Sequence, residues 1–157
     1  MAVDLGQQVP DITFTDTDRQ QKKISDFAGK TLVLAFFPGA FTGVCTKEAC
    51  TFRDSAAEYA SLNAQVVGVT VDSIFALKAW GDQNSITYPL VSDQSRAAVT
   101  ALGTELPNFG GMPGYVSSKR AVFVIDKAGV LRYTETTANP GVEPDYEALK
   151  QAVAAAR

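Results

Sequence analysis

The sequence of 157 residues contains no histidine. This absence excludes nucleophiles activated by a Cys-His or Ser-His-Asp arrangement, His-ligated zinc or haem, and acid-base catalysis by imidazole. The two cysteines, Cys45 and Cys50, are too few for a structural zinc site, which needs four Cys or His ligands. Any cysteine chemistry must therefore be activated by an arginine, a lysine or a helix N-terminus.

Long apolar runs and an excess of positive charge are also missing. The longest apolar runs, such as residues 32–37 and 121–125, are far too short to cross a bilayer, so we expect no membrane association. The net charge of -3 argues against a nucleic-acid-binding surface. Because the N-terminus has no basic flank followed by an apolar stretch, we expect no secretory signal and a cytoplasmic location. In that reducing compartment, two cysteines are more often redox-active than permanently bonded.

The remaining composition is that of an ordinary globular protein, with 46% hydrophobic and 20% charged residues. The length predicts a single domain spanning residues 1–157. Three apolar runs without polar alternation predict strands buried on both faces: residues 31–37, 66–71 and 121–125. Three stretches with apolar residues at helical spacing predict helices: residues 45–62, 72–84 and 144–156. We expect Asp72 to cap the second helix and Pro144 to open the third.

Two hairpins complete the predicted pattern. Residues 122–126 and 130–136 flank a turn at residues 127–129, and residues 12–15 and 22–25 flank a polar turn near the N-terminus. The alternation of strands and helices predicts an α/β fold, with a central mixed sheet flanked by helices.

Residues 103–118 stand apart because they contain four glycines, two prolines and few regularly spaced apolar positions. They predict either a plain surface loop or a mobile loop that borders a site or a subunit contact. Phe109 and Met112 in this stretch are compatible with a subunit interface. Phe41, in another loop, is expected to pack, with a pocket lining or a dimer contact as the alternatives.

The junction around Cys45 carries the clearest chemical signal. A predicted strand leads through Pro38 into a helix, for which Thr42 is the candidate N-cap, so Cys45 falls in the first turn. Cys45 also lies four residues before Ala49 on the apolar helix face, so it should point inward, partly shielded from water. Because a helix N-terminus favours thiolate over thiol, this placement predicts a reactive cysteine. A small buried apolar residue is the alternative.

The second cysteine follows Cys45 at a spacing that differs from the Cys-x-x-Cys of thioredoxin-type oxidoreductases. In an ideal helix, Cα atoms five residues apart are separated by about 8.6 Å. A disulfide needs a Cα separation of about 7 Å or less. A bond between Cys45 and Cys50 therefore requires the first turns to unwind, and it should be easily reduced. The alternative is that Cys50 simply lies on the helix flank.

The segment FFPGAFTGVCTKEACTFRD, residues 36–54, resembles the peroxiredoxin signature Pro-x3-Thr-x2-Cys, with Pro38, Thr42 and Cys45 at its positions. The resemblance extends over almost the whole chain. It implies a thioredoxin-like fold and a site that uses no metal and no organic cofactor. It also implies reduction of hydrogen peroxide and small organic hydroperoxides, in which Cys45 attacks the O–O bond and becomes a sulfenic acid.

The resemblance assigns roles to the residues around this cysteine. Pro38 would shield Cys45, and the Thr42 hydroxyl would hold the thiolate and the peroxide oxygen. The backbone N–H groups of Val44 and Cys45 would complete the oxygen-binding corner. The family also requires an arginine from a later strand, and Arg120 in SKRAVFVID is its match.

Glu48 lies one helical turn after Cys45. It could orient Arg120, or it could serve as a favourable anion in the first turn of the helix.

Two groups within the family share features with this sequence. CTKEACTFRD resembles the Q-type, or bacterioferritin-comigratory-protein, group. There a cysteine at the Cys50 position resolves the sulfenic acid within one chain, and a thioredoxin-like dithiol donor reduces the disulfide. FFPGAFTGVC and NPGVEPDYEALKQAV resemble the one-cysteine alkyl hydroperoxide reductase E group, which would leave resolution to an external thiol. We prefer the Q-type interpretation because Cys50 has the spacing that its mechanism uses.

The lack of a C-terminal cysteine excludes the two-cysteine mechanism that crosses between subunits, although a homodimer remains compatible with the sequence. Two other classes of protein would show the same cysteine pair. A redox sensor would use the disulfide to change a surface, and a structural thioredoxin-like domain would have an ordinary thiol at Cys45.

Overall fold

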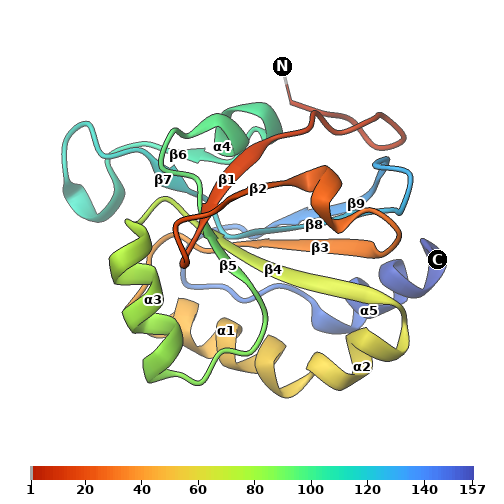
Figure 1. Cartoon of the computed structure of the whole chain (residues 1–157). Helices are drawn as coiled ribbons and strands as arrows, with labels where there is room; N and C mark the ends of the chain where they lie inside the picture. Colours follow the sequence, from red (N-terminus) through yellow and green to blue (C-terminus); the bar gives the residue numbers. More distant parts are fainter. Residues whose placement is uncertain (1) are drawn as a thin grey trace.

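The computed structural model describes residues 2–157 as a seven-stranded mixed sheet with helices on both faces (Figure 1). Its strands are β1 (Thr13–Asp16), β2 (Gln21–Lys23), β3 (Thr31–Phe36), β4 (Ala64–Thr70), β5 (Leu90–Ser92), β6 (Glu105–Leu106), β7 (Ser117–Ser118), β8 (Ala121–Ile125) and β9 (Leu131–Thr136). The α-helices are α1 (Gly43–Asp54), α2 (Ala56–Ser61), α3 (Ile74–Gln83), α4 (Ala97–Leu102) and α5 (Tyr146–Ala155). Two 3₁₀ helices are η1 (Ile24–Phe27) and η2 (Phe109–Gly111).

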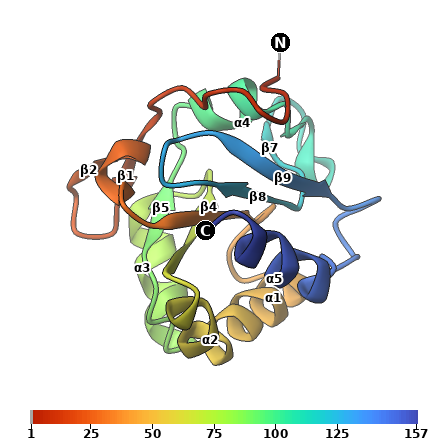
Figure 2. The same ribbon diagram turned by 90° about the vertical axis from the view of Figure 1, so that its right-hand side faces the viewer.

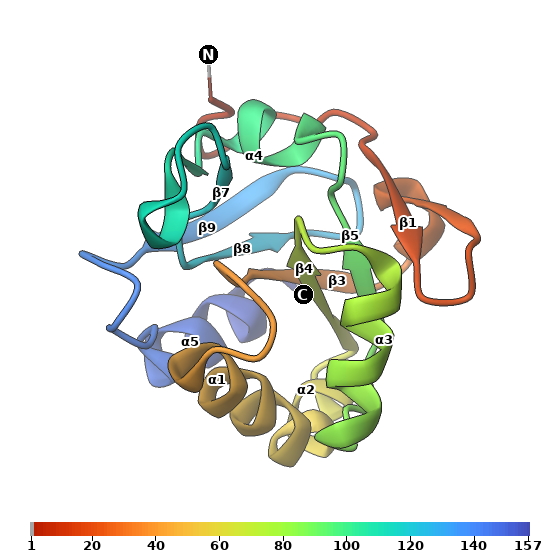
Figure 3. The same ribbon diagram turned by 90° about the vertical axis from the view of Figure 1, so that its left-hand side faces the viewer.

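The main sheet has the strand order β2-β1-β5-β4-β3-β8-β9, and β6 and β7 form a separate pair. Helices α1, α2, α3 and α5 cover one face, and α4 covers the other (Figures 2 and 3). The central strand β3 is buried throughout, because alternate side chains enter two separate cores. Leu32, Leu34 and Phe36 face the core on the α4 side, whereas Val33 and Ala35 face the core formed with α1, α3 and α5.

The direction of the strands determines where the chemistry lies. β3 is parallel to β4 and antiparallel to β8, so that Phe36 at the end of β3 pairs with Ala121 at the start of β8. Cys45 follows β3 in the chain, and Arg120 immediately precedes β8. The topology therefore brings these two residues to the same edge of the sheet.

The structure confirms the predicted mixed α/β sheet, its buried strands and both hairpins. Three predictions about the helices were wrong: the extent of the first, the cap of the second and the first residue of the third. The stretch 45–62 forms two helices, because the chain breaks at Ser55, whose φ and ψ are −98° and 7°. Ser73 rather than Asp72 caps α3, by accepting a hydrogen bond from Ala76 N. Asp145 caps α5, so Pro144 precedes the helix instead of opening it.

The sequence patterns missed all of the short elements β5, β6, β7, α4, η1 and η2, of which β5 and α4 belong to the main sheet and its helical cover. Strand β5 has only three residues, and α4 has six. Helix α4 begins after Arg96, which adopts a left-handed conformation with φ of 63° and gives no side-chain cap. Its capping comes from Asp93, which accepts hydrogen bonds from Ala98 N and Val99 N. Within residues 2–157, no helix has both the length and the apolar character needed to cross a membrane.

Candidate active site

The loop between β3 and α1, residues 38–42, is held by contacts from several parts of the chain. The Ser117 hydroxyl donates a hydrogen bond to the Pro38 carbonyl, and the Thr42 hydroxyl donates to the Gly39 carbonyl at 2.7 Å. Gly39 also lets Phe109 approach closely, since a Cβ there would lie only 3.1 Å from the ring. Residues 103–118 therefore border this loop, and the mobility suggested for that stretch stays a prediction.

Cys45 is the third residue of α1 and has no exposed surface. It was predicted to be only partly shielded, and the structure buries it completely. Its Sγ accepts a hydrogen bond from Nη2 of Arg120 at 3.2 Å. The sulfur therefore lies inside the fold, hydrogen-bonded to the positively charged guanidinium of Arg120.

Arg120 is itself buried and is held on three sides. Its Nη1 donates to Oε1 of Glu48 at 2.9 Å, and its Nη2 and Nε donate to the Pro140 carbonyl at 2.7 and 3.0 Å. Burial alone would lower the pKa of Arg120, but the adjacent Cys45 and Glu48 raise it above its usual value. The guanidinium is thus a permanent cation whose planar group is oriented toward the sulfur.

Glu48 is fully buried, and its Oε2 has no hydrogen-bond partner. Burial raises the pKa of Glu48 to about 7, against the opposing effect of the Arg120 hydrogen bond. Because Glu48 is the sixth residue of α1, the suggested role as an anion in the first turn is wrong. Its hydrogen bond with Arg120 instead agrees with the other role suggested from the sequence, which is to orient Arg120.

Thr42 occupies the N-cap position of α1, but its side chain accepts no capping hydrogen bond, and its hydroxyl instead donates to the Gly39 carbonyl. The first bond of the helix runs from Thr46 N to Thr42 O at 3.0 Å. The N–H groups of Val44 and Cys45 precede that bond and have no partner within the helix. Two backbone donors are therefore available beside the sulfur.

Cys50 has a different environment on the same intact helix. It is half-buried, and its Sγ lies 4.0 Å from Oδ1 of Asn84. Arg53, one turn further along, donates from Nη1 to the Asn84 carbonyl at 2.7 Å. Both cysteines are free thiols.

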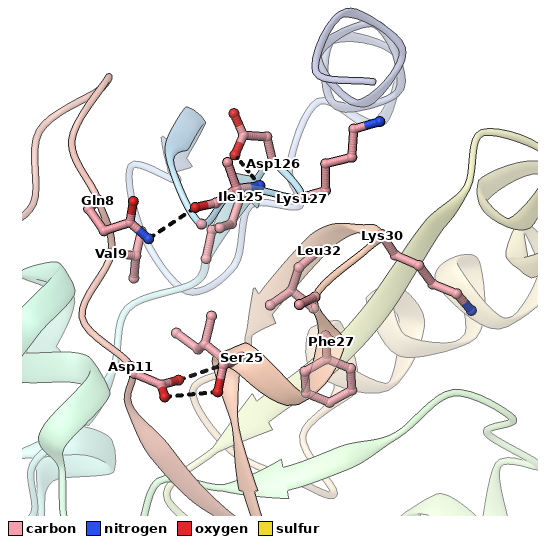
Figure 4. A pocket seen from close by; sticks show the side chains of 14 residues that line it. Gln8, Val9, Asp11, Ser25, Phe27, Lys30, Leu32, Ile125, Asp126 and Lys127 are labelled. Atoms are coloured by element: carbon pink, nitrogen blue, oxygen red, sulfur yellow. Dashed lines mark hydrogen bonds between the residues drawn. The ribbon is translucent and has the colours of Figure 1, made fainter.

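A cavity of about 220 Å³ lies at the opposite edge of the sheet, near the start of β3 and the end of β8 (Figure 4). Several of its polar side chains are already paired: Asp11 accepts from the Ser25 hydroxyl at 2.8 Å, and Gln8 donates to the Ala128 carbonyl at 3.1 Å. No cysteine lines it. We therefore place the candidate active site at the other end of the strands, where Cys45, Arg120 and Glu48 contact one another.

Three contacts of the site were missed from the sequence. The Pro140 acceptor is a backbone carbonyl, for which a side-chain pattern gives no signal. Ser117 belongs to the glycine-rich stretch, which was expected to border a site without any residue being singled out. Asp72 was expected to cap a helix, whereas its Oδ2 accepts a hydrogen bond from Ala40 N at 2.8 Å.

Comparisons with known proteins agree with this geometry. Residues 5–134 match the model of the AhpC/TSA family. A protein of Synechocystis named as a peroxiredoxin is 38% identical over 139 residues, which cover 82% of this chain and 66% of the relative. Chloroplastic peroxiredoxin Q of Triticum aestivum is 35% identical over 131 residues, covering 83% of this chain and 58% of the relative. The chain thus spans about three-fifths of the length of these relatives.

Among solved structures, peroxidoxin BcpB from Mycobacterium tuberculosis superposes with a TM-score of 0.85 at 27% identity. The superposition covers 98% of this chain and 97% of that one. The similarity therefore extends over almost the whole chain.

Proposed function

Because the chain belongs to the AhpC/TSA family, among the Q-type and BCP-like peroxiredoxins, we propose that it is a thiol-dependent peroxidase with Cys45 as its nucleophile. The observation that carries this proposal is the buried chain of contacts from Cys45 Sγ through Arg120 to Glu48. We further propose that residues 1–157 act as a single peroxiredoxin domain.

In the first step, the Cys45 thiolate attacks one oxygen of the peroxide, and an S–O bond forms as the O–O bond breaks. Cysteine is oxidised to a sulfenic acid, while the peroxide is reduced to water or an alcohol after the leaving oxygen takes up a proton. Arg120 and the N–H groups of Val44 and Cys45 stabilise the charge that develops on the leaving oxygen. Pro38 restricts access of water, and the Thr42 hydroxyl turns from Gly39 toward the peroxide oxygen.

In the second step, the Cys50 thiolate attacks the sulfenic sulfur, forming a disulfide and releasing water after protonation. The intact helix α1 contains both cysteines, and about 8.6 Å separates Cα atoms five residues apart in an ideal helix. The segment between Cys45 and Cys50 must therefore unwind before the bond can form. A dithiol protein of the thioredoxin type then reduces the disulfide, and its own two thiols become a disulfide.

Hydrogen peroxide and small organic hydroperoxides are the proposed substrates. The proposed setting is the reducing cytoplasm, in which both cysteines would rest as free thiols. A homodimer is compatible with the exposed side chains of Phe41 and Met112 near the site.

Mass measurement after one equivalent of peroxide tests both steps together. The wild-type protein should lose two hydrogen atoms, and Cys50→Ser should instead gain one oxygen atom, which a sulfenic-acid reagent traps. If the wild type gains oxygen and keeps a free thiol, resolution belongs to an external thiol, as in a one-cysteine enzyme. Stoichiometric reaction without turnover, even with a dithiol donor present, would indicate a redox sensor instead.

A further inference from the structure

The loop at residues 38–42 has a polar contact that the proposed mechanism does not use. Its Ala40 N–H donates a hydrogen bond of 2.8 Å to Oδ2 of Asp72, a half-buried residue. Asp72 follows β4, and β4 runs parallel to β3, so both strands deliver their ends to the same edge of the sheet. A carboxylate from one strand end therefore fixes the loop that follows the neighbouring strand.

Asp72 is well suited to act as an anchor because its own backbone is held in place. Its N–H donates to the Thr70 hydroxyl at 3.0 Å, and its carbonyl accepts from the Ser92 hydroxyl at 2.6 Å. The next residue, Ser73, caps α3 by accepting from Ala76 N at 3.2 Å. Capping and loop contact are thus divided between two adjacent side chains, which leaves the Asp72 carboxylate free to bind the loop.

The loop needs such an anchor because it contains an unfavourable conformation. Phe41, directly after Ala40, has a φ of 65° and a side chain that is 54% exposed. A bulky residue in the left-handed region persists only where its surroundings hold it. The exposed ring contributes little packing to hold it, so it depends on the contacts of its neighbours: the Ala40 N–H bond to Asp72 and the Thr42 hydroxyl bond to the Gly39 carbonyl. Of these two, the Asp72 bond alone ties the loop to another part of the fold.

We infer that Asp72 is a positioning residue for peroxide reduction. By fixing Ala40, it sets the conformation of Phe41 and the placement of Thr42 relative to Cys45. This inference rests on the proposed function, since Thr42 and the first N–H groups of α1 bind the reacting peroxide oxygens. A small displacement of such groups is costly to the rate, although it leaves the thiol itself unchanged.

The test compares Asp72→Ala, Asp72→Asn and Ser73→Ala, each in a Cys50→Ser background so that only one thiol reacts. Three quantities are measured: the rate constant of Cys45 with hydrogen peroxide, its rate constant with iodoacetamide, and the thermal midpoint. Alkylation needs a reactive thiolate but no donors for a peroxide oxygen. Ser73→Ala is the matched control, because it removes the cap of α3 without touching the loop.

We expect Asp72→Ala to slow the peroxide reaction by about tenfold or more, while alkylation stays within about twofold. Asp72→Asn should recover most of the rate, because the carboxamide oxygen can accept the same hydrogen bond. Ser73→Ala should lower the thermal midpoint and leave both rate constants near those of the parent. If Asp72→Ala does not fold, Asp72→Ser, which is too short to reach Ala40 N, carries the same expectation.

An unchanged peroxide rate in Asp72→Ala would overturn the inference. So would an equal loss in both reactions, since that pattern indicates a general disturbance of the site. A failure of the proposed function looks different: the Cys50→Ser parent itself would then react with peroxide no faster than an ordinary thiol.

Discussion

The two cysteines share one helix, but the protein surrounds them in opposite ways. Cys45 is fully buried and hydrogen-bonded to Arg120, which is held in turn by Glu48 and the Pro140 carbonyl. Cys50 is half-buried and has only a contact of 4.0 Å with an amide oxygen. In the proposed mechanism, one sulfur reacts in the folded state, whereas the other reacts only after the backbone moves.

This difference teaches how one helix can serve two steps with conflicting needs. Attack on peroxide requires rigid donors around one sulfur, because stabilisation of the leaving oxygen depends on preorganised geometry. Disulfide formation requires the same segment to unwind. In the proposed mechanism, strong contacts at the first turn and weak contacts five residues later would allow the first step to be fast without making the second impossible.

The largest contrast is expected from removing each sulfur in turn. Cys45→Ser should abolish peroxide consumption, because no other thiol has the donors needed for the attack. Cys50→Ser should keep the first oxidation near the wild-type rate and lose only the disulfide. Peroxide loss in a single-turnover assay measures both. Substantial peroxide consumption by Cys45→Ser would show that Cys50 is also a nucleophile, and the comparison would fail.

The next prediction compares the two arginines near the cysteines. Arg120→Lys should slow the peroxide reaction by about a hundredfold, because one ammonium cannot hold the sulfur, Glu48 and Pro140 together. Arg53→Lys, near Cys50, should leave that rate close to the wild-type value. Stopped-flow measurement of the peroxide rate constant checks the pair. An unchanged rate in Arg120→Lys would show that charge alone, rather than the geometry at Cys45, determines the reactivity.

Much of this arrangement could be predicted from the sequence. The buried strands and the helix that begins near Cys45 follow from apolar patterning, because their side chains fill the two cores. The partnership of Cys45 with Arg120 came only from family resemblance, since 75 residues separate them and no local pattern links them. The pairing of β3 with β8 supplies the physical reason for their proximity.

Other parts of the site lay beyond sequence reasoning for identifiable reasons. The Pro140 carbonyl is a backbone group, so its identity as an acceptor depends on the path of the chain rather than on residue type. Asp72 and Ser73 are both good helix caps, and only the structure shows which of them caps the helix. Complete burial of Cys45 required knowledge of the tertiary packing, which a single helix face cannot supply.

The third prediction concerns Glu48, which belongs to the rigid surroundings of Cys45, and the pH dependence of the free energy of unfolding. Its folded-state pKa is raised to about 7 from 4.5, so the folded protein holds this proton more tightly than the unfolded chain does. Its contribution to stability should therefore be complete below about pH 4.5 and be lost as the pH rises through about 7. Glu48→Gln cannot titrate, so it should lack this part of the decline. Urea unfolding of both proteins on either side of this window measures it, and identical pH slopes would contradict the expectation.

The smallest expected effect concerns the segment between the cysteines. Lys47 lies in this segment and forms an ion pair of 3.1 Å with Glu143, which holds α1 to the residues before α5. Lys47→Ala should speed disulfide formation by up to about fivefold, because an exposed ion pair contributes about 1 kcal/mol at most. Trp80, the one tryptophan, donates to the Thr46 hydroxyl at 3.0 Å, so its fluorescence should report the unwinding.

Lys150→Ala is the matched control for this last prediction. Lys150 also forms a 3.1 Å ion pair, with Glu58, and that pair joins α5 to α2 without involving α1, which carries both cysteines. Its removal should leave the rate of disulfide formation unchanged. If both substitutions speed the reaction equally, general loosening of the helical layer explains the effect. If neither does, the barrier lies in the contacts around Cys45 itself, and the rigid end of the helix then controls both steps.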